Sequence, residues 1–272
     1  MKETILKLAL VFLIATTTSV FAADEEQKCD EVVIDIVGKF LKINDVFWYK
    51  ESPNPGVIVA ATCKSSPQHK NIVLASIAYD LFDKNQPEKE LEKELIVAMV
   101  NVKTKQVVSN YQNTIGEDAI TEVGVSSLKI DTARYQLNKN TRAFGLMFNS
   151  VAHGPNCGEN YWGDELTLFV QKGKNLEPVL WDLPMQFTHF KKGCPAIFNV
   201  EDVDIEYSFL TVEVQKTSNK GYADLLLTAH ISDSGERDLK PKPTDERCLL
   251  TYDGKRYVKD KKFKSWWMFD SW

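Results

Sequence analysis

The stretch HGPNCGENYWGDE, residues 153–165, gathers more reactive side chains than any other segment of the sequence. A thiol, an imidazole and three carboxylates lie within these thirteen residues. Such a set suits a thiol nucleophile with a histidine base, a metal site, or a loop held by a disulfide. Its glycine, proline and asparagine residues indicate a turn-rich loop, and long loops on β scaffolds often carry function.

A catalytic interpretation makes Cys157 the nucleophile and His153 its base, with Asp164 as a further candidate. No flanking motif of a cysteine hydrolase surrounds Cys157, and a lone thiol in an oxidising compartment is exposed to oxidation. A metal site built from His153, Cys157, Glu159 or Asp164 would lack the paired ligand spacing of zinc sites. We therefore favour Cys157 as a disulfide partner, and we expect no metal and no cofactor.

Aromatic residues gather at two places that suit contact with a partner. Tyr161 and Trp162 lie in the loop, and Trp266 and Trp267 lie in the C-terminal segment SWWMFDSW, residues 265–272. Aromatic side chains are enriched at protein interfaces, so we expect these four residues to bind a partner. The basic stretch before the tail also allows the tail to lie on an anionic membrane surface. Burial of the tail on the body, as a closing strand or cap, is the interpretation favoured by the rarity of exposed aromatic clusters in monomers.

The N-terminus has the charged, apolar and small-residue pattern of a cleavable signal peptide. We expect cleavage after Ala22 and a periplasmic or secreted protein, which makes disulfides the default for the cysteines. We predict the pair Cys29–Cys63, and the odd number of cysteines leaves one thiol over. The five candidates are Cys29, Cys63, Cys157, Cys194 and Cys248.

The rest of the composition excludes several classes of function. The formal charge of −5 does not suggest nucleic-acid binding, which favours a basic face. No second long apolar run follows the signal, so we expect no transmembrane helix in the mature chain. The sequence has no zinc-protease, nucleophile-elbow or phosphate-loop motif, and we interpret His69, His189 and His230 as isolated surface or core residues.

Strand signals dominate the chain, and they fall into three similar groups. Each group has two apolar strands, a long loop, and then a hairpin-like pair of strands with a Lys, Gly or Asp turn. In the last hairpin, Asp253–Gly254 predicts a two-residue turn. We predict a mostly β domain over residues 56–264, made of three four-stranded antiparallel meander units, propeller-like or forming a large β-sandwich. The units are residues 56–113, 127–183 and 207–263.

The sequence of the N-terminal segment, residues 23–55, does not distinguish a helix from strands. Its stretch 31–50 suits either closing strands or a docking helix, because its periodicity is ambiguous. Farther along, residues 201–207 alternate so that Asp202, Asp204 and Glu206 share one face of a strand. We interpret this as a solvated face in preference to a cation site, because calcium ligands cluster around a turn.

Two stretches carry a resemblance to known proteins. SSLKIDTARYQLNKNTRAFGLMF (126–148) and DELTLFVQKGKNLEPVL (164–180) resemble a group of uncharacterised secreted proteobacterial proteins, and PGVIVAATCK (55–64) and EDA (117–119) fit the same pattern. The resemblance implies export and a continuous β unit. It implies no catalytic residue and no ligand.

The hypothesis that follows is a non-enzymatic exported protein that binds an envelope or protein partner. One alternative is an envelope hydrolase that uses Cys157 with His153 or carboxylates among Asp118, Asp164 and Glu165; two such carboxylates would have to face each other across a substrate. A third is a structural or assembly protein whose C-terminal tail docks on a membrane surface.

Overall fold

The computed structural model describes residues 27–43, 47–48, 57–80, 91–152, 160–193, 203–233, 237, 239–240, 242 and 245–259. Most of these residues lie in strands, which confirms the mostly β prediction. Among them, no helix is long and apolar enough to cross a membrane.

The first group of strands forms four antiparallel neighbours, each paired with the next along the chain. These strands are β2 (Val57–Ser65), β3 (Ile72–Asp80), β4 (Glu92–Asn101) and β5 (Gln106–Gly116). β3 and β4 are buried along most of their length. Their nearly continuous apolar sequence fits this position, because a strand covered on both faces needs no polar alternation.

In its described residues, 31–43 and 47–48, the segment with ambiguous periodicity forms a helix and a very short strand. Helix α1 (Glu31–Leu41) packs its apolar face on β2, β3 and β4. It ends at Leu41, because the next residue, Lys42, has a left-handed φ of 61°. Strand β1 (Phe47–Trp48) pairs in parallel with β2. A disulfide joins Cys29, just before the helix, to Cys63 on β2, which confirms the predicted pair.

Two further groups of strands follow. The second comprises β6 (Leu128–Gln136), β7 (Arg142–Phe148), β8 (Asn160–Lys172) and β9 (Asn175–Lys192), and the third β10 (Asp204–Asn219), β11 (Tyr222–Ser232), β12 (Glu246–Tyr252) and β13 (Tyr257–Lys259). Within each group the strands again pair antiparallel in chain order. β9 joins the groups, because it meets β5 in parallel at Asn110–Asn175 and pairs with β10 near its own end.

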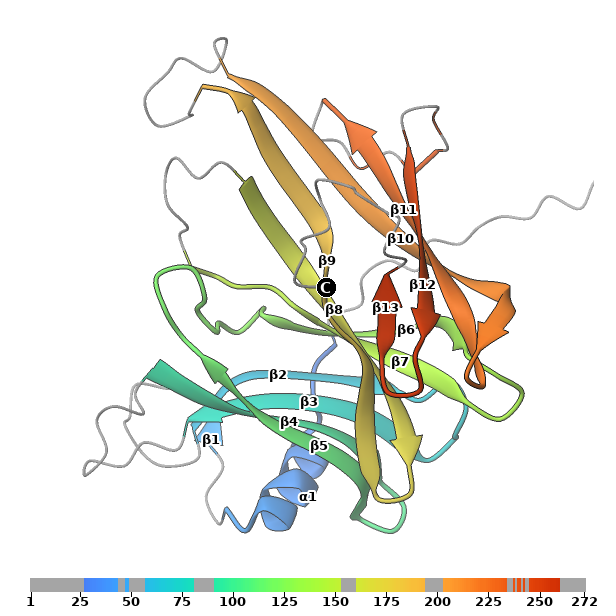
Figure 1. The fold of residues 1–272 in the computed structure, drawn as a ribbon. Coiled ribbons are helices and arrows are strands. Elements are labelled where there is room, and N and C mark those ends of the chain that lie inside the picture. Colours follow the sequence, from blue (N-terminus) through green and yellow to red (C-terminus); the bar gives the residue numbers. More distant parts are fainter. Residues whose placement is uncertain are drawn as a thin grey trace, which may run out of the picture.

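The groups pack in layers around β6–β9. Figure 1 shows α1 on one side of β2–β5 and the later strands on the other. One face of the middle strands packs on β2–β4 through residues such as Phe144 and Phe169. The other face packs on the third group through residues such as Leu168, Leu227 and Leu250, all of them fully buried. The sheet stays open, with β1 and β13 at the ends of the strand order.

The last hairpin differs from its prediction in the length of the turn. Tyr252 pairs with Tyr257, so four residues connect β12 to β13. Asp253 does not take a positive φ; its carboxylate accepts the backbone N–H groups of Lys255 and Arg256, and only Gly254 has a positive φ, of 104°. The aspartate side chain thus closes a wider turn than the two-residue type, as aspartates at turns often do.

Candidate functional site

The reactive stretch of residues 153–165 divides into two parts in the structure. Residues 153–159, with His153 and Cys157, lie outside the described residues, as do Cys194, Trp266 and Trp267. The later part was predicted as loop, but strand β8 already begins at Asn160, so the backbone of Tyr161 and Trp162 pairs with Thr188 and Phe187 of β9. The extension is possible because β9 is long, and aromatic residues favour strands.

Each of the three described cysteines either forms a disulfide or is buried in the core. Cys29 and Cys63 form the disulfide between α1 and β2. Cys248 is buried at the centre of β12, with only 1% of its surface exposed, and its sulfur donates to the carbonyl of Leu249. The described part of the chain thus places no cysteine in an accessible reactive site.

The carboxylates of the hydrolase alternative take different positions. Asp118 accepts the backbone N–H groups of Ile120 and Thr121, and these bonds lower the pKa of its carboxyl. Its carboxylate therefore shapes the loop in which it lies. Asp164 has a φ of 53°, and its neighbour Glu165 lines a cavity that Asp164 does not. Glu165 is thus the one carboxylate of the predicted set with a place in a candidate site.

This cavity, of about 210 Å³, lies between β5 and the middle strands. Its floor belongs to the apolar core of that interface and includes Leu95, Leu128, Leu146 and Phe169. Its upper walls carry aromatic and polar side chains from β5, β8 and β9 and from the loop of residues 117–127. A concave apolar site with a few convergent polar groups is the usual form of a binding pocket.

A β-bulge explains how the cavity obtains two of its walls. Leu166 pairs with Leu183 and Leu168 with Leu180, so Thr167 alone faces both Trp181 and Asp182. On a regular strand, adjacent side chains point to opposite faces of the sheet. Here the bulge, with a φ of 42° at Asp182, places both Trp181 and Asp182 along the cavity. Bulges often redirect side chains in this way at functional sites.

The aromatic wall consists of Trp181 and Tyr111. Their ring centroids lie 6.1 Å apart with the ring planes at 81°, and Tyr111 also packs on Phe169 at 5.2 Å. Trp181 is 41% exposed, so a large part of its ring remains accessible. Burial and the negative charge of Asp182 both raise the pKa of the Tyr111 hydroxyl, which keeps this ring neutral.

The polar wall is fixed by reciprocal hydrogen bonds. The Thr167 hydroxyl donates to Oδ1 of Asp182 at 3.0 Å, and the backbone N–H of Asp182 donates back to the Thr167 oxygen at 3.1 Å. Glu165 adds a second carboxylate, and Asn113 adds an amide. Among the residues that line this cavity in the structure, none is lysine, arginine or histidine. The charged side chains of the described lining are thus acidic.

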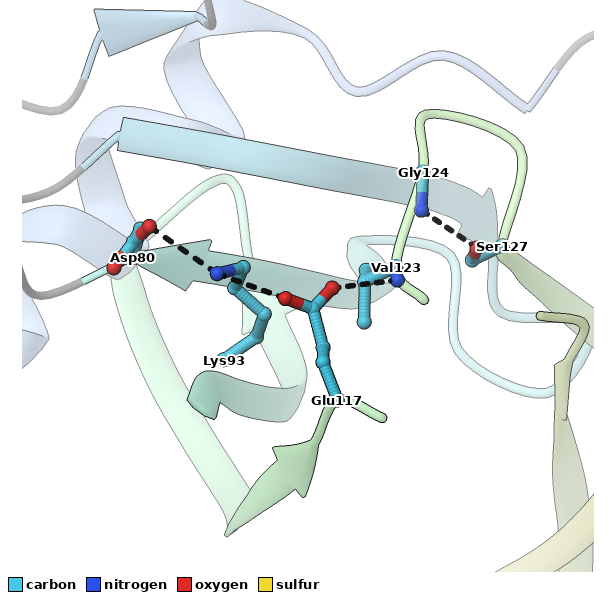
Figure 2. A network of polar contacts seen from close by, with 6 residues as sticks. All are labelled: Asp80, Lys93, Glu117, Val123, Gly124 and Ser127. Atoms are coloured by element: carbon cyan, nitrogen blue, oxygen red, sulfur yellow. Dashed lines mark hydrogen bonds and ion pairs between the residues drawn. The ribbon is translucent and has the colours of Figure 1, made fainter. Parts of the chain in front are cut away.

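The loop of residues 117–127, which brings Thr121 to the cavity, is held by an ion-pair network (Figure 2). Lys93 Nζ lies 3.3 Å from Asp80 Oδ2 and 3.0 Å from Glu117 Oε2. Glu117 Oε1 accepts the backbone N–H of Val123 at 2.8 Å. Burial by itself would lower the pKa of Lys93, but the hydrogen bonds and charges of the two carboxylates outweigh it and raise the pKa. The lysine stays charged and anchors the loop.

A second polar cluster corrects the interpretation of His230 as isolated. The Thr211 hydroxyl lies 3.1 Å from His230 Nε2, and Asp245 Oδ2 lies 3.1 Å from Nδ1. The order resembles the nucleophile, base and acid of a hydrolase. However, Nδ1 is not aligned for a hydrogen bond to Asp245, and His230 is only 5% exposed. We therefore assign this cluster a structural role in holding the segment before β12.

His69 and the acidic residues of β10 lie outside the cavity beside the bulge. His69 lines a second cavity, of about 180 Å³, together with Arg142. The guanidinium of Arg142 donates hydrogen bonds to the backbone carbonyls of Thr132 and Ala133, so this group is bound within the protein. On the acidic face of β10, Asp204 is exposed, but the Glu206 side chain is only 17% exposed and pairs with Lys191 at 2.8 Å. Asp202 lies outside the described residues.

The comparisons with known proteins give no further guidance: no family model, no curated protein and no solved structure matches the chain. The resemblance to secreted proteobacterial proteins stays a prediction. The cavity beside the bulge was missed by sequence reasoning. A signal for the bulge is nevertheless present, because Pro178 and Pro184 flank Trp181 and Asp182 on β9, and proline within a sheet is found mainly on edge strands or at bulges.

Proposed function

We propose that this chain is an exported, non-enzymatic binding protein that captures an envelope or protein partner, with the bulge-lined cavity as its capture site. One observation carries the proposal: the bulge places the exposed ring of Trp181 and the carboxylate of Asp182 along the same cavity. Exposed tryptophan in a pocket is the kind of residue that dominates binding energy at interfaces. The fixed Thr167–Asp182 pair supports a preformed site.

The test is capture of envelope components by immobilised protein, compared between the wild type and Trp181→Ala. Phe40→Ala is the matched control, because Phe40 is also 41% exposed but lies on α1, away from the cavity. We expect Trp181→Ala to lose at least tenfold in partner affinity and Phe40→Ala to keep it, because loss of a hot-spot aromatic costs about 2 kcal/mol or more. Equal capture by both variants would refute the cavity as the capture site.

We propose that the partner also contacts Tyr161, Trp162 and the Trp266–Trp267 pair. The support is their aromatic character and, for Tyr161 and Trp162, their place at the start of β8, the strand that also carries Glu165. Alanine at Tyr161 and Trp162 together should weaken capture. Unchanged capture by this double variant would remove them from the contact surface.

We propose export through a cleaved signal at residues 1–22, to the periplasm or outside the cell. A disulfide between Cys29 and Cys63 is compatible with such an oxidising location. N-terminal sequencing of protein recovered from the export compartment should begin at Ala23. Recovery of an intact Met1 end would contradict this proposal.

We also propose that the three groups of four strands are repeats of one meander unit. In support, each group pairs in chain order, and each has its long connection between the second and third strands, after Asp80, Phe148 and Ser232. The open strand order favours a layered, sandwich-like arrangement over a propeller. A homologue in which a fourth such unit has been inserted would be strong support.

An envelope hydrolase is the second candidate, and the observation that favours it is the meeting of Glu165 and Asp182 in one cavity. The variants Glu165→Gln and Asp182→Asn should each abolish turnover of an envelope polysaccharide. Full activity in both would exclude this candidate. The tail-docking alternative predicts that deletion of residues 265–272 releases the protein from membrane fractions.

A further inference from the structure

The cavity combines features that select for one chemical class of ligand. Its carboxylates come from Asp182 and Glu165, and its accessible aromatic faces come from Tyr111 and Trp181. The charged side chains among the described lining residues are these two carboxylates. Glu165 also has an interaction within the protein, so Asp182 is the carboxylate assigned to the ligand. A negatively charged site with aromatic walls attracts an organic cation, because the ring faces and the carboxylates both stabilise positive charge.

From this arrangement we infer that the cavity binds the guanidinium group of an arginine side chain on a protein partner. This inference rests on the proposed function, because it assigns the ligand of the same site. A guanidinium is planar and weakly hydrated, so it can stack on the ring of Trp181 while its N–H groups donate to a carboxylate. The Thr167 hydroxyl donates to Oδ1 of Asp182 and so holds this carboxylate in one orientation at the cavity wall.

Other cations fit the cavity less well. A bare metal ion requires several oxygen, nitrogen or sulfur ligands, and the described residues contain no group of three or more histidine, cysteine or acidic side chains that could hold one. A quaternary ammonium has no N–H groups to donate to Asp182 and Glu165. The floor of Leu95, Leu128 and Leu146 suits the apolar stem of an arginine, which packs along nonpolar surface.

The size of the cavity also limits the ligand. Its volume of about 210 Å³ is below the range typical of sites for drug-sized molecules, about 300–1,000 Å³. A single side chain that enters from a partner's surface is in keeping with this size, whereas a branched oligosaccharide is not. The cavity would thus receive one anchoring residue of a larger interface.

The test measures binding of two short peptides that differ in one group, Gly-Arg-Gly and Gly-citrulline-Gly, both with blocked ends. Citrulline keeps the shape of arginine and lacks its charge, so it separates charge recognition from shape. Binding is followed by the chemical shift of the indole N–H groups in ¹⁵N spectra of the full mature protein. We expect the arginine peptide to bind with Kd on the order of 1 mM, and the citrulline peptide at least tenfold more weakly.

Variants locate the binding. Asp182→Asn should weaken the arginine peptide about tenfold, and asparagine tolerates the positive φ at this position, so the fold should be kept. Glu177→Gln is the matched control: Glu177 is on the same strand, is 46% exposed, and pairs with Lys172 outside the cavity. Glu165→Gln provides a second probe if Asp182→Asn proves unstable.

The outcomes separate this inference from the proposed function. Equal binding of the citrulline peptide, a lysine peptide or choline would overturn the guanidinium assignment, as would an Asp182→Asn variant that binds the arginine peptide normally. If Trp181→Ala loses partner capture while these peptide results are negative, the capture site stands and only the ligand class is wrong. If Trp181→Ala retains capture, the proposed function fails first.

Discussion

Replacement of Lys93 by methionine should be among the most destabilising single substitutions of a charged residue in this protein. The lysine lies between Asp80 and Glu117. The side chain of Lys93 is 11% exposed, that of Asp80 is 26% exposed and that of Glu117 is 14% exposed. Removal of Lys93 leaves two carboxylates facing each other with little solvent. Breaking a buried ion pair from one side costs about 3–5 kcal/mol, and the partial exposure of Asp80 places the expected loss near 3 kcal/mol.

Urea unfolding followed by circular dichroism measures this loss. The matched control is Lys172→Met, because Lys172 and its partner Glu177 are 44% and 46% exposed, and an exposed pair contributes about 0.5 kcal/mol or less. The double variant Lys93→Met with Glu117→Gln should recover part of the loss, since one stranded charge is gone. A loss below about 1 kcal/mol for Lys93→Met would show that the network carries little of the stability.

The pH dependence gives a further check on Lys93. Its pKa in the folded protein is raised, so the stabilisation is fully present below the ordinary value of 10.5 and is lost as the pH rises through the folded value. The difference in unfolding free energy between the wild type and Lys93→Met should therefore stay constant from about pH 6 to pH 9. A difference that shrinks across this range would contradict the raised pKa.

Three other predictions follow from local packing and burial. Cys29 and Cys63 are separated by 34 residues, so replacing both by alanine should cost roughly 4 kcal/mol in urea unfolding; a loss under about 1 kcal/mol would contradict it. Gly145→Ala should lower the free energy of unfolding by about 2 kcal/mol or more, because the new Cβ would lie 2.6 Å from a side-chain carbon of Leu166 on the neighbouring strand. In the control Gly116→Ala, no atom lies within 4 Å of the new Cβ, so stability should change little. Burial, with a smaller contribution from the charge of Glu94, raises the pKa of Tyr79 to about 12. The stability that the neutral Tyr79 side chain confers below pH 10 is therefore lost as the pH rises toward 12. Tyr79→Phe should remove one phenolate step near pH 12 from the absorbance titration.

The sequence predicted the strands better than it predicted what joins them. Apolar runs such as residues 94–101 are long and rich in β-branched residues, so they form strands wherever they pack. The stretch 31–50 stayed ambiguous because the helix it contains is stabilised by packing on β2–β4, which local periodicity does not report. The turn at Asp253 was wrong in length because its side chain supplies hydrogen bonds that the residue pair alone does not reveal.

The candidate site was the least predictable feature. Its residues come from β5, β8 and β9, which are distant in the sequence and adjacent only through strand pairing. The bulge at Trp181 and Asp182 depends on a register shift against Thr167, and register is set by the whole sheet. The reactive residue types of 153–165 pointed to this stretch, and of its described residues, 160–165, Glu165 is the one that lines the cavity.

The disulfide between Cys29 and Cys63 has a consequence for a protein that meets proteases. Cleavage of any single peptide bond between these two residues leaves both fragments covalently joined, because the bridge spans the cut. α1 lies wholly within that span, so after a cut between Leu41 and Cys63 the helix stays tied to β2 through Cys29. One-site proteolysis there would leave a single species on a non-reducing gel and two fragments only after reduction.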